Sequence, residues 1–473
     1  MLSTLEQFNE RVRRSVFFKM ILVGILILLL LIPSGMITGL INERQFREQN
    51  VVFEVSSTWG NPQVVAGPFL MVPYQKVTNN EKGNPYTSIE HAYFLPDALL
   101  VEGNIQPEFR KRGIYEVLLY RSELTLKGVF SRPDFSSWKI TPEQVLWKDA
   151  QLLLGLTDLR GIREGIGFRW KGENKLLEPG LPSKEVLESG AMVGVDLSQP
   201  GPYSYEIGLK LNGSNTFHIV PVGKETNVTL SGGWGKPSFT GAFLPDRSEI
   251  TDDGFTGEWK VLHLNRNFPQ KWQGSAYRFG STPQMYSDPY QKDFYLPTPS
   301  MVEGVPSIRE GNDASASAFG LRLLIPVDHY QKVERSAKYM ILFVFLTFLV
   351  FFFVEVLNKK RIHPMQYLLV GSALLIFYLL LLSLSEYIIF AYAYFVGAAA
   401  TIGLITLYSL SVFHLPRLSL LLAGILILLY GFLYILLQLE DYALLVGSIG
   451  LFMILAVIMF ITRKIDWYSE RTI

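Results

Sequence analysis

The stretch RIHPMQYLLVG, residues 361–371, places a histidine and a glutamine close together at the start of a long apolar segment. His363 and Gln366 both offer hydrogen-bonding groups, so they could form a polar site at a membrane boundary. The same residues also suit the first turn of a helix, because Pro364 lacks only an N–H that this position leaves unused. Two interpretations are therefore open, a functional site or the start of a transmembrane helix.

Glu386, within SLSEYIIF, is the other side chain suited to chemistry. A carboxylate in the middle of a bilayer would suggest a proton or ion pathway. The uncharged residues 362–385 that precede it would form a helix of about 36 Å, whereas the hydrocarbon core is about 30 Å thick. We therefore expect Glu386 at the outer interface, in a turn between two helices. A ligand or proton site is the alternative.

Other catalytic and cofactor motifs are absent from the sequence. No H-E-x-x-H, G-x-S-x-G, Walker A or G-x-G-x-x-G pattern occurs. The six histidines are scattered, none is paired at the spacing of helical metal ligands, and the chain has no cysteine. We therefore expect no catalytic residue, no cofactor and no metal ion. The charged stretch DLRGIREG, residues 158–165, is interpreted as a solvated loop, with an anion-binding or partner-binding turn as the alternative.

The distribution of apolar residues determines which elements carry these side chains. The chain of 473 residues is 49% hydrophobic and 18% charged, with a net charge of +1, so no nucleic-acid partner is expected. About 20 residues cross a bilayer as a helix. Uncharged runs lie at 20–42, 339–354, 362–385, 387–416, 418–439 and 442–462. The run 339–354 is short, but Glu355 can lie at the interface and the helix can continue toward Leu357. We predict six transmembrane helices. The first is expected to be an uncleaved anchor, because its apolar stretch continues past Pro33 without an A-x-A site.

Basic residues near the helix ends predict the orientation. Lysines and arginines occur within residues 11–19, at 359–361, at Arg417 and within 463–471, whereas the opposite turns carry acidic residues. Both termini are therefore predicted to be cytoplasmic. The predicted organisation is a basic N-terminus 1–19, a first helix 20–42, a periplasmic domain 43–337, a five-helix transmembrane block 338–462 and a cytoplasmic tail 463–473.

The region 43–337 shows the alternation of apolar and polar residues that is typical of half-buried strands. In 204–211 the apolar residues are Tyr205, Ile207, Leu209 and Leu211. Residues 121–130 and 319–327 follow the same pattern. We predict a large β-rich extracytoplasmic domain of antiparallel strands, so the fold class is a mixed membrane protein with this domain between its first and second helices.

Two short repeats and one long loop complete this region. FLPD occurs at 94–97 and 243–246, and YQKV occurs at 74–77 and 330–333. If they reflect duplication, they suggest related lobes or a pairing of the first and last strands; chance recurrence is the alternative. Residues 280–318 are rich in Pro, Ser, Gly and Asn, which predicts a long loop or linker, with a partner-binding loop as the alternative.

Several strings resemble the signature of CreD inner membrane proteins. They are HPMQYLLVG (363–371), LLLSLSEY (380–387), TRKIDWY (462–468), KRGIYEVLLYRSELTLKGVF (111–130), DLRGI (158–162) and SFTGAFLPD (238–246). The resemblance covers most of the chain and agrees with the order of its parts. It implies a role in envelope integrity, colicin tolerance and the response to β-lactam stress under a two-component system. His363, Pro364, Gln366, Glu386, Asp466 and Trp467 match this signature without a known role.

We therefore expect a non-enzymatic inner-membrane protein whose periplasmic domain binds or senses an envelope component. Its partners would be the lipid bilayer and envelope proteins or cell-wall components. The candidate functional residues are His363, Gln366, Glu386, Asp466 and Trp467. The alternative is a lipid or small-molecule transporter or flippase with a periplasmic gating domain; sparse charge within the helices argues against ion coupling.

Overall fold

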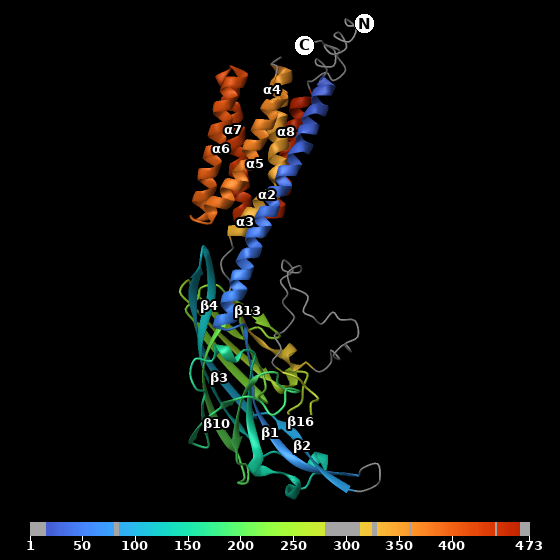
Figure 1. The fold of residues 1–473 in the computed structure, drawn as a ribbon, viewed down its shortest axis with the longest axis vertical. Coiled ribbons are helices and arrows are strands. Elements are labelled where there is room, and N and C mark those ends of the chain that lie inside the picture. The colour runs from blue at the N-terminus through green and yellow to red at the C-terminus, as the bar shows by residue number, and fades with distance from the viewer. Residues whose placement is uncertain are drawn as a thin grey trace. The chain divides into compact units, whose positions relative to one another are not determined.

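The computed structural model describes residues 16–79, 85–279, 313–323, 329–358, 362–439 and 442–463. The chain forms two compact units. One contains Met1–Gln49 and Val327–Ile473, and the other contains Asn50–Pro326. The first unit is helical and the second consists mainly of β-strands (Figure 1).

The first unit is built from helices. They are α2 (Val16–Trp59), α3 (His329–Ala337), α4 (Met340–Leu357), α5 (Pro364–Ser385), α6 (Phe390–Phe413), α7 (Pro416–Gln438) and α8 (Ala443–Thr462). Helix α3 is short and amphipathic and the others are long and apolar; α2 continues into the second unit. Within the described residues, five helices are long and apolar enough to span a membrane, and α3 with α4, bent by 43°, would make a sixth. Helix α2 contains the predicted span 20–42 and continues to Trp59.

The second unit contains two sheets in the described part of the chain. Sheet A has nine strands: β1 (Gln63–Asn79), β2 (Pro85–Phe94), β5 (Ala150–Leu156), β8 (Glu178–Pro179), β9 (Gly190–Val195), β11 (Thr216–Val220), β13 (Pro237–Gly241), β16 (Lys271–Gln273) and β17 (Phe319–Leu323). Sheet B has eight: β3 (Ala98–Arg112), β4 (Tyr115–Phe130), β6 (Gly167–Trp170), β7 (Glu173–Leu176), β10 (Tyr203–Ser214), β12 (Glu225–Gly232), β14 (Arg247–Ile250) and β15 (Phe255–Leu262). An apolar helix followed by a β-domain and then by a helical block confirms the predicted fold class.

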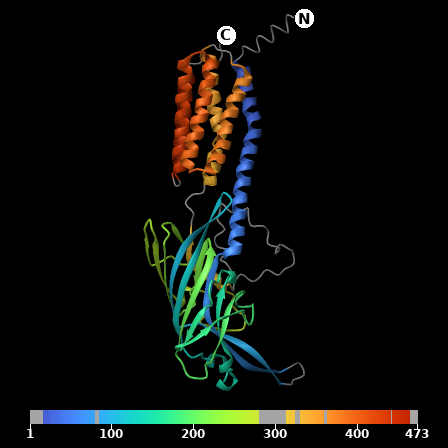
Figure 2. The ribbon, with the colours of Figure 1, turned by 60° about the vertical axis from the view of Figure 1, so that its left-hand side comes forward.

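The two sheets pack against each other around one aromatic-rich core (Figures 1 and 2). Tyr120 of β4 meets Phe217 of β11 edge to face, with ring centroids 6.2 Å apart. Phe239 of β13 meets Trp259 of β15 in the same way at 5.5 Å. Such aromatic pairs add to the free energy gained by burying apolar surface. Sheet B therefore has one face buried against sheet A and one face that is open.

The predicted alternation is seen directly in β10. Tyr205, Ile207, Leu209 and Leu211 are buried, while the residues between them are half-buried or exposed. Period-two patterning does not reveal strand direction, and here the expectation of antiparallel strands needs correction. Most pairs are antiparallel, but β1 lies parallel to β11 and β3 lies parallel to β12.

The aspartates of the two FLPD segments make the same contacts. The N–H of Asp97 donates to the carbonyl of Val129 and its carboxylate accepts from the N–H of Ser131. The N–H of Asp246 donates to Glu258 and its carboxylate accepts from Lys260. Each aspartate thus begins a strand, β3 or β14, against its antiparallel neighbour. The aspartate of FLPD therefore has the same structural role in both copies, at the start of a strand.

YQKV is not a structural repeat. Its first copy lies in strand β1 and its second copy lies in helix α3. Strands β1 and β17 do not pair directly, because β11 lies between them in sheet A. Most of the predicted loop 280–318 lies outside the described residues, and its end contains a short 3-10 helix, Ala314–Ser317.

The DLRGI segment fixes the junction between α2 and β1, contrary to the interpretation as a solvated loop. Asp158 is 7% exposed and accepts hydrogen bonds from the N–H of Asn61 (3.1 Å) and from the N–H of Arg160 (3.0 Å). Gln63 donates to the carbonyls of Asp158 and Asn212. A Cβ on Gly161 would lie 2.4 Å from the Asn212 carbonyl oxygen, so only glycine fits this position.

The contacts of Asp158 also control its ionisation. Burial alone would raise its pKa, but hydrogen bonds from Arg160 and from the Asn61 N–H outweigh this effect and lower the pKa. The folded state therefore favours the ionised carboxylate more than the unfolded chain does.

We predict that Asp158→Ala lowers the free energy of unfolding of the second unit by about 2 kcal/mol, because buried donors lose their acceptor. Since the folded pKa is depressed, this contribution is present at neutral pH and is lost as the pH falls below about 4. Thermal unfolding of the full chain, followed by tryptophan fluorescence at several pH values, measures the effect. Asp252→Ala, at an exposed carboxylate, is the control. Equal stability of the two variants at neutral pH would contradict the assigned role.

Candidate functional site

His363 and Gln366 are brought together at the start of α5. His363 is the N-cap residue, and its Nδ1 accepts a hydrogen bond from the N–H of Met365 at 3.2 Å. The side-chain oxygen of Gln366 accepts from the N–H of His363 at 2.9 Å. Pro364 occupies the first turn. These reciprocal contacts form a capping box, which satisfies backbone donors at a helix start.

The next residues of the same stretch connect α5 to α4 and α2. The Tyr367 hydroxyl donates to the Glu355 carboxylate at 2.9 Å, and the Lys19 ammonium lies 2.8 Å from the same carboxylate. The Glu355 side chain is only 6% exposed. We call Lys19, Glu355 and Tyr367 the Lys19 cluster.

Gly371 ends the stretch and allows α2 and α4 to approach α5. A Cβ at this position would lie 2.3 Å from a methyl carbon of Leu30 and 2.9 Å from the ring of Phe348. Leu30 is 2% exposed, although most of the α2 span is exposed in the unit. Close approach of helices over a glycine is a common way of packing in membranes.

Glu386 is held in a second polar cluster. Its carboxylate accepts a hydrogen bond from the Tyr330 hydroxyl at 3.0 Å and lies 3.6 Å from the Arg44 guanidinium of α2. The side chain is 7% exposed. Glu386 is the C-cap of α5, so it lies in the turn before α6, as expected for its position. We call Arg44, Tyr330 and Glu386 the Arg44 cluster.

Helix α3 joins this cluster to the ends of other helices. Arg335 donates to the carbonyl of Leu439 at 2.9 Å, just after the last turn of α7. The ammonium of Lys332 lies 5.5 Å from the ring centroid of Phe390, the first residue of α6. Capping of a helix C-terminus by a cation and cation–π contacts are both favourable. Helix α3 therefore connects α5, α6 and α7 at one end of the helical unit.

The two clusters are separated by almost the whole apolar span of α2. Lys19 and Arg44 are 25 residues apart (44 − 19), which corresponds to about 38 Å along a helix. This exceeds the hydrocarbon thickness of about 30 Å. Both carboxylates can therefore lie near the interfaces, where pairing holds α2 to the other helices at each end.

Sequence reasoning identified Glu386 but missed its partners Tyr330 and Arg44 and the whole Lys19 cluster. The sequence contained a signal for these pairs. A basic residue lies at each end of the first span, and an acidic residue lies at the end of each of two later spans. Asp466 and Trp467, the remaining candidates, lie outside the described residues.

The histidines do not form a metal site in the part of the chain that is described. No group of three or more His, Asp or Glu side chains there could hold a metal ion. His218 of β11 is 5% exposed and its Nε2 lies 3.0 Å from the Thr240 hydroxyl. Burial, and then the Arg322 guanidinium, lower the pKa of His218 to about 4, so it is neutral at physiological pH.

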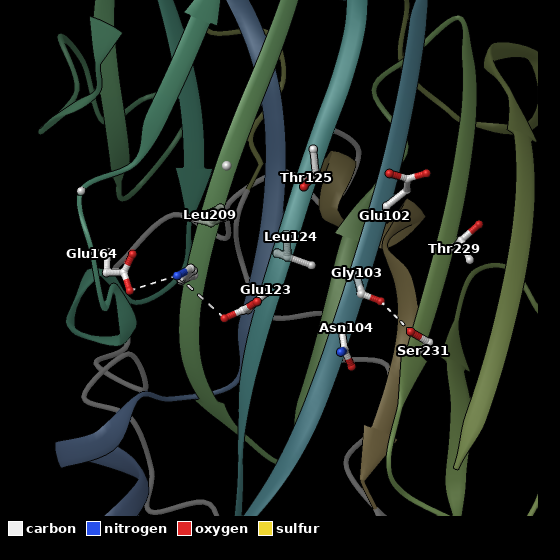
Figure 3. A pocket seen from close by; sticks show the side chains of 13 residues that line it. Glu102, Gly103, Asn104, Glu123, Leu124, Thr125, Glu164, Leu209, Thr229 and Ser231 are labelled. Carbon is white, nitrogen blue, oxygen red and sulfur yellow. Dashed lines mark hydrogen bonds and ion pairs between the residues drawn. The ribbon is translucent and has the colours of Figure 1, made fainter. Parts of the chain in front are cut away.

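The open face of sheet B contains a polar groove that sequence reasoning did not find (Figure 3). A hollow of about 690 Å³ lies over β3, β4, β10 and β12. Figure 3 shows Glu102, Thr125 and Thr229 along one part of it and Glu123, Asn104 and Ser231 along another. A second hollow of about 440 Å³ shares Asn104 and Ser231 and continues toward β14 and β15. We call the two hollows together the acidic groove. Side chains that cluster across several strands cannot be found from the sequence unless the register of the strands is known.

The groove contains one lysine, which is already paired. The Lys210 ammonium lies 3.1 Å from the Glu164 carboxylate and 3.9 Å from that of Glu123. No partner of Glu102 is found among the described residues. This arrangement offers hydrogen-bonding groups and uncompensated negative charge to a ligand.

Several hydroxyl groups are buried without hydrogen-bond partners among the described residues of the helical unit. They include those of Tyr378 and Tyr430, which are 0% and 2% exposed. The neighbouring Tyr394 hydroxyl donates to the carbonyl of Tyr430 at 2.6 Å. Unpaired buried hydroxyls are uncommon in proteins, so these two stand out in the helical interior.

We predict that Leu30→Cys combined with Gly371→Cys gives an intramolecular crosslink on mild oxidation, because the two positions are in contact. The chain has no native cysteine, so the product is unambiguous on a non-reducing gel. Ile32→Cys with Gly371→Cys is the control, since Ile32 is 65% exposed on another side of α2. Crosslinking of the control pair as efficiently as the test pair would contradict the packing of α2.

Comparisons with known proteins agree with the apolar helices of the chain. The family model described as "Inner membrane protein CreD" matches residues 15–468. The curated Inner membrane protein CreD of Escherichia coli (strain K12) is 33% identical over 467 residues, which cover 96% of this chain and 94% of that relative. Several apolar helices and this family description make the chain a multi-pass inner-membrane protein in contact with the lipid bilayer. The chain therefore belongs to the CreD family of inner membrane proteins.

Proposed function

We propose that this protein is non-enzymatic and supports cell-envelope integrity and the stress response by binding or sensing an envelope component with its β-domain. The observation that carries this proposal is the acidic groove, which combines a hollow with unpaired polar groups on an open sheet face. Ligand sites typically combine concavity with a few convergent polar groups. The binding partner would be an envelope protein or a cell-wall component.

The helical unit would serve as an anchor that responds to the state of the domain. The carboxylates of Glu355 and Glu386 both take part in ion pairs and tyrosine hydrogen bonds. A carboxylate used for proton transfer would need to exchange its partner during each cycle. The contacts therefore favour a role in holding helices together over a role in ion transport.

The proposed topology places both termini in the cytoplasm and residues 43–337 in the periplasm. The first helix would span 20–42, and five further helices would lie within 338–462. Basic residues at one set of helix ends support this orientation.

We predict that a single cysteine introduced at Glu173 is labelled in intact cells by a maleimide that does not cross the inner membrane. A cysteine introduced at Asn358, next to the basic run 359–361, should be labelled only after the cells are lysed. The chain without introduced cysteine is the background control, because it has no thiol. The reverse pattern of labelling would refute the topology.

We predict that Thr229→Trp, which fills the acidic groove, abolishes the ability of the chain to restore envelope resistance in a strain that lacks it. Growth with detergent or a β-lactam measures this ability, and immunoblotting of membranes checks that the variant is present. Glu173→Trp, at an exposed position on the edge strand β7, adds the same side chain outside the groove and should remain active. Full activity of Thr229→Trp would refute binding in the groove.

The same growth assay distinguishes the binding function from the second candidate function, that of a lipid or small-molecule transporter or flippase. Its support is the pair of buried, unpartnered hydroxyls of Tyr378 and Tyr430. Under the binding function, Tyr378→Phe and Tyr430→Phe should retain activity, because removing an unpaired hydroxyl costs little. Loss of activity in these variants, with Thr229→Trp still active, would favour transport.

A further inference from the structure

The acidic groove crosses the strands of sheet B. Strand register places Lys210, Glu123, Asn104, Ser231, Thr256 and Glu249 in one row from β10 to β14. A parallel row contains Gly208, Thr125, Glu102, Thr229 and Glu258. Neighbouring strands are about 4.8 Å apart, so six strands extend over about 24 Å. A ligand that fills the groove must therefore be elongated.

Negative charge dominates the lining of the groove. Its carboxylates are those of Glu102, Glu123, Glu164, Glu249 and Asp253, and its only cation among the lining residues is Lys210. Lys210 is already engaged by two of these carboxylates. The other three, on β3, on β14 and after β14, have no ion pair or hydrogen bond with any described residue. A hollow lined by one sign of charge concentrates ligands of the opposite sign.

Three other cations on the same face are paired outside the groove, while Arg247 of β14 lies opposite Glu258 at the end of the second row. Lys127 and Arg169 both contact Glu206, at 3.7 Å and 3.1 Å. Lys260 lies 2.9 Å from Glu225. The five carboxylates of the groove outnumber Lys210 and Arg247, so the groove has a net negative charge.

The spacing of the carboxylates excludes a compact cation as the ligand that matches the groove. Glu123 on β4 and Glu249 on β14 are four strand positions apart, or about 19 Å. The described carboxylates also do not form a group that could chelate a metal ion. The matching ligand carries several separate cationic groups along its length.

Polypeptide fits this description better than sugar. The aromatic residue in the lining is Phe255, whose side chain is 4% exposed and packs in the core, so the groove offers no ring for a sugar to stack on. Gly208 lies on the open face, where a Cβ would meet nothing within 4 Å, so it leaves room for an extended backbone. Serine, threonine and asparagine side chains can hydrogen-bond to that backbone.

We propose that the acidic groove binds an extended polypeptide segment rich in lysine or arginine. At about 3.3 Å per residue, roughly seven residues span the groove. This inference rests on the proposed binding function and specifies its ligand class. Electrostatic complementarity of this kind gives specificity and a salt-dependent affinity.

The test uses the full chain in nanodiscs of zwitterionic phosphatidylcholine and a fluorescent peptide of about ten residues with alternating lysine and threonine. The expected result is saturable binding, measured by fluorescence anisotropy, that weakens about tenfold or more between about 50 mM and about 300 mM NaCl. A peptide with glutamate in place of lysine should not bind. Binding of both peptides alike would overturn the proposal.

Two variants with equal loss of charge locate the site. Combining Glu102→Gln, Glu249→Gln and Asp253→Asn should weaken binding of the lysine peptide at least about tenfold. Combining Glu173→Gln, Glu178→Gln and Glu188→Gln removes three exposed carboxylates outside the groove and should leave affinity within about twofold of the parent. Equal weakening of the two variants, or none in the first, would overturn the proposal.

Failure of this inference differs from failure of the proposed function. If the parent chain does not bind the lysine peptide but Thr229→Trp is inactive in cells, the ligand class is wrong and the binding function stands. If Thr229→Trp is fully active in cells, the groove has no role in function and both proposals fall.

Discussion

A carboxylate removed from water needs a cation or hydrogen-bond donors, and this requirement organises the helical unit. Glu355 and Glu386 are both nearly inaccessible, and each is matched by a basic residue of α2 and by a tyrosine hydroxyl. Loss of either partner would leave a charge in a place of low polarity. Helix α2 is thus held at both ends by electrostatics, and Gly371 permits close packing between these ends.

Helix α3 has a special position in this arrangement. It follows the last described strand of the β-domain in the chain and precedes the bend into α4. Through Tyr330, Lys332 and Arg335 it contacts the end regions of three other helices. Helix α3 therefore links the ends of α5, α6 and α7 within the helical unit.

In the β-domain, the two faces of sheet B have different roles because side chains alternate along a strand. One set, such as Ile207 and Leu209, fills the core, while the other set, such as Gly208 and Lys210, forms the open face. Short sequence motifs fix where some strands of the domain begin. The FLPD aspartates begin two strands, and Asp158 with its hydrogen bonds fixes the transition from α2 to β1. The aspartates of FLPD and DLRGI therefore have structural roles in this domain.

The sequence by itself determined the family, the apolar helices, the β-rich character of the middle region and the place of Glu386 at a helix end. These properties depend on hydrophobic runs, alternation and local motifs, which are all readable within a short window of residues. Only the tertiary structure decided which charges meet, since Lys19 and Glu355 are far apart in the chain. It likewise decided the parallel pairing of β3 with β12 and hence the acidic groove, because strand register depends on contacts between distant segments and not on local propensity.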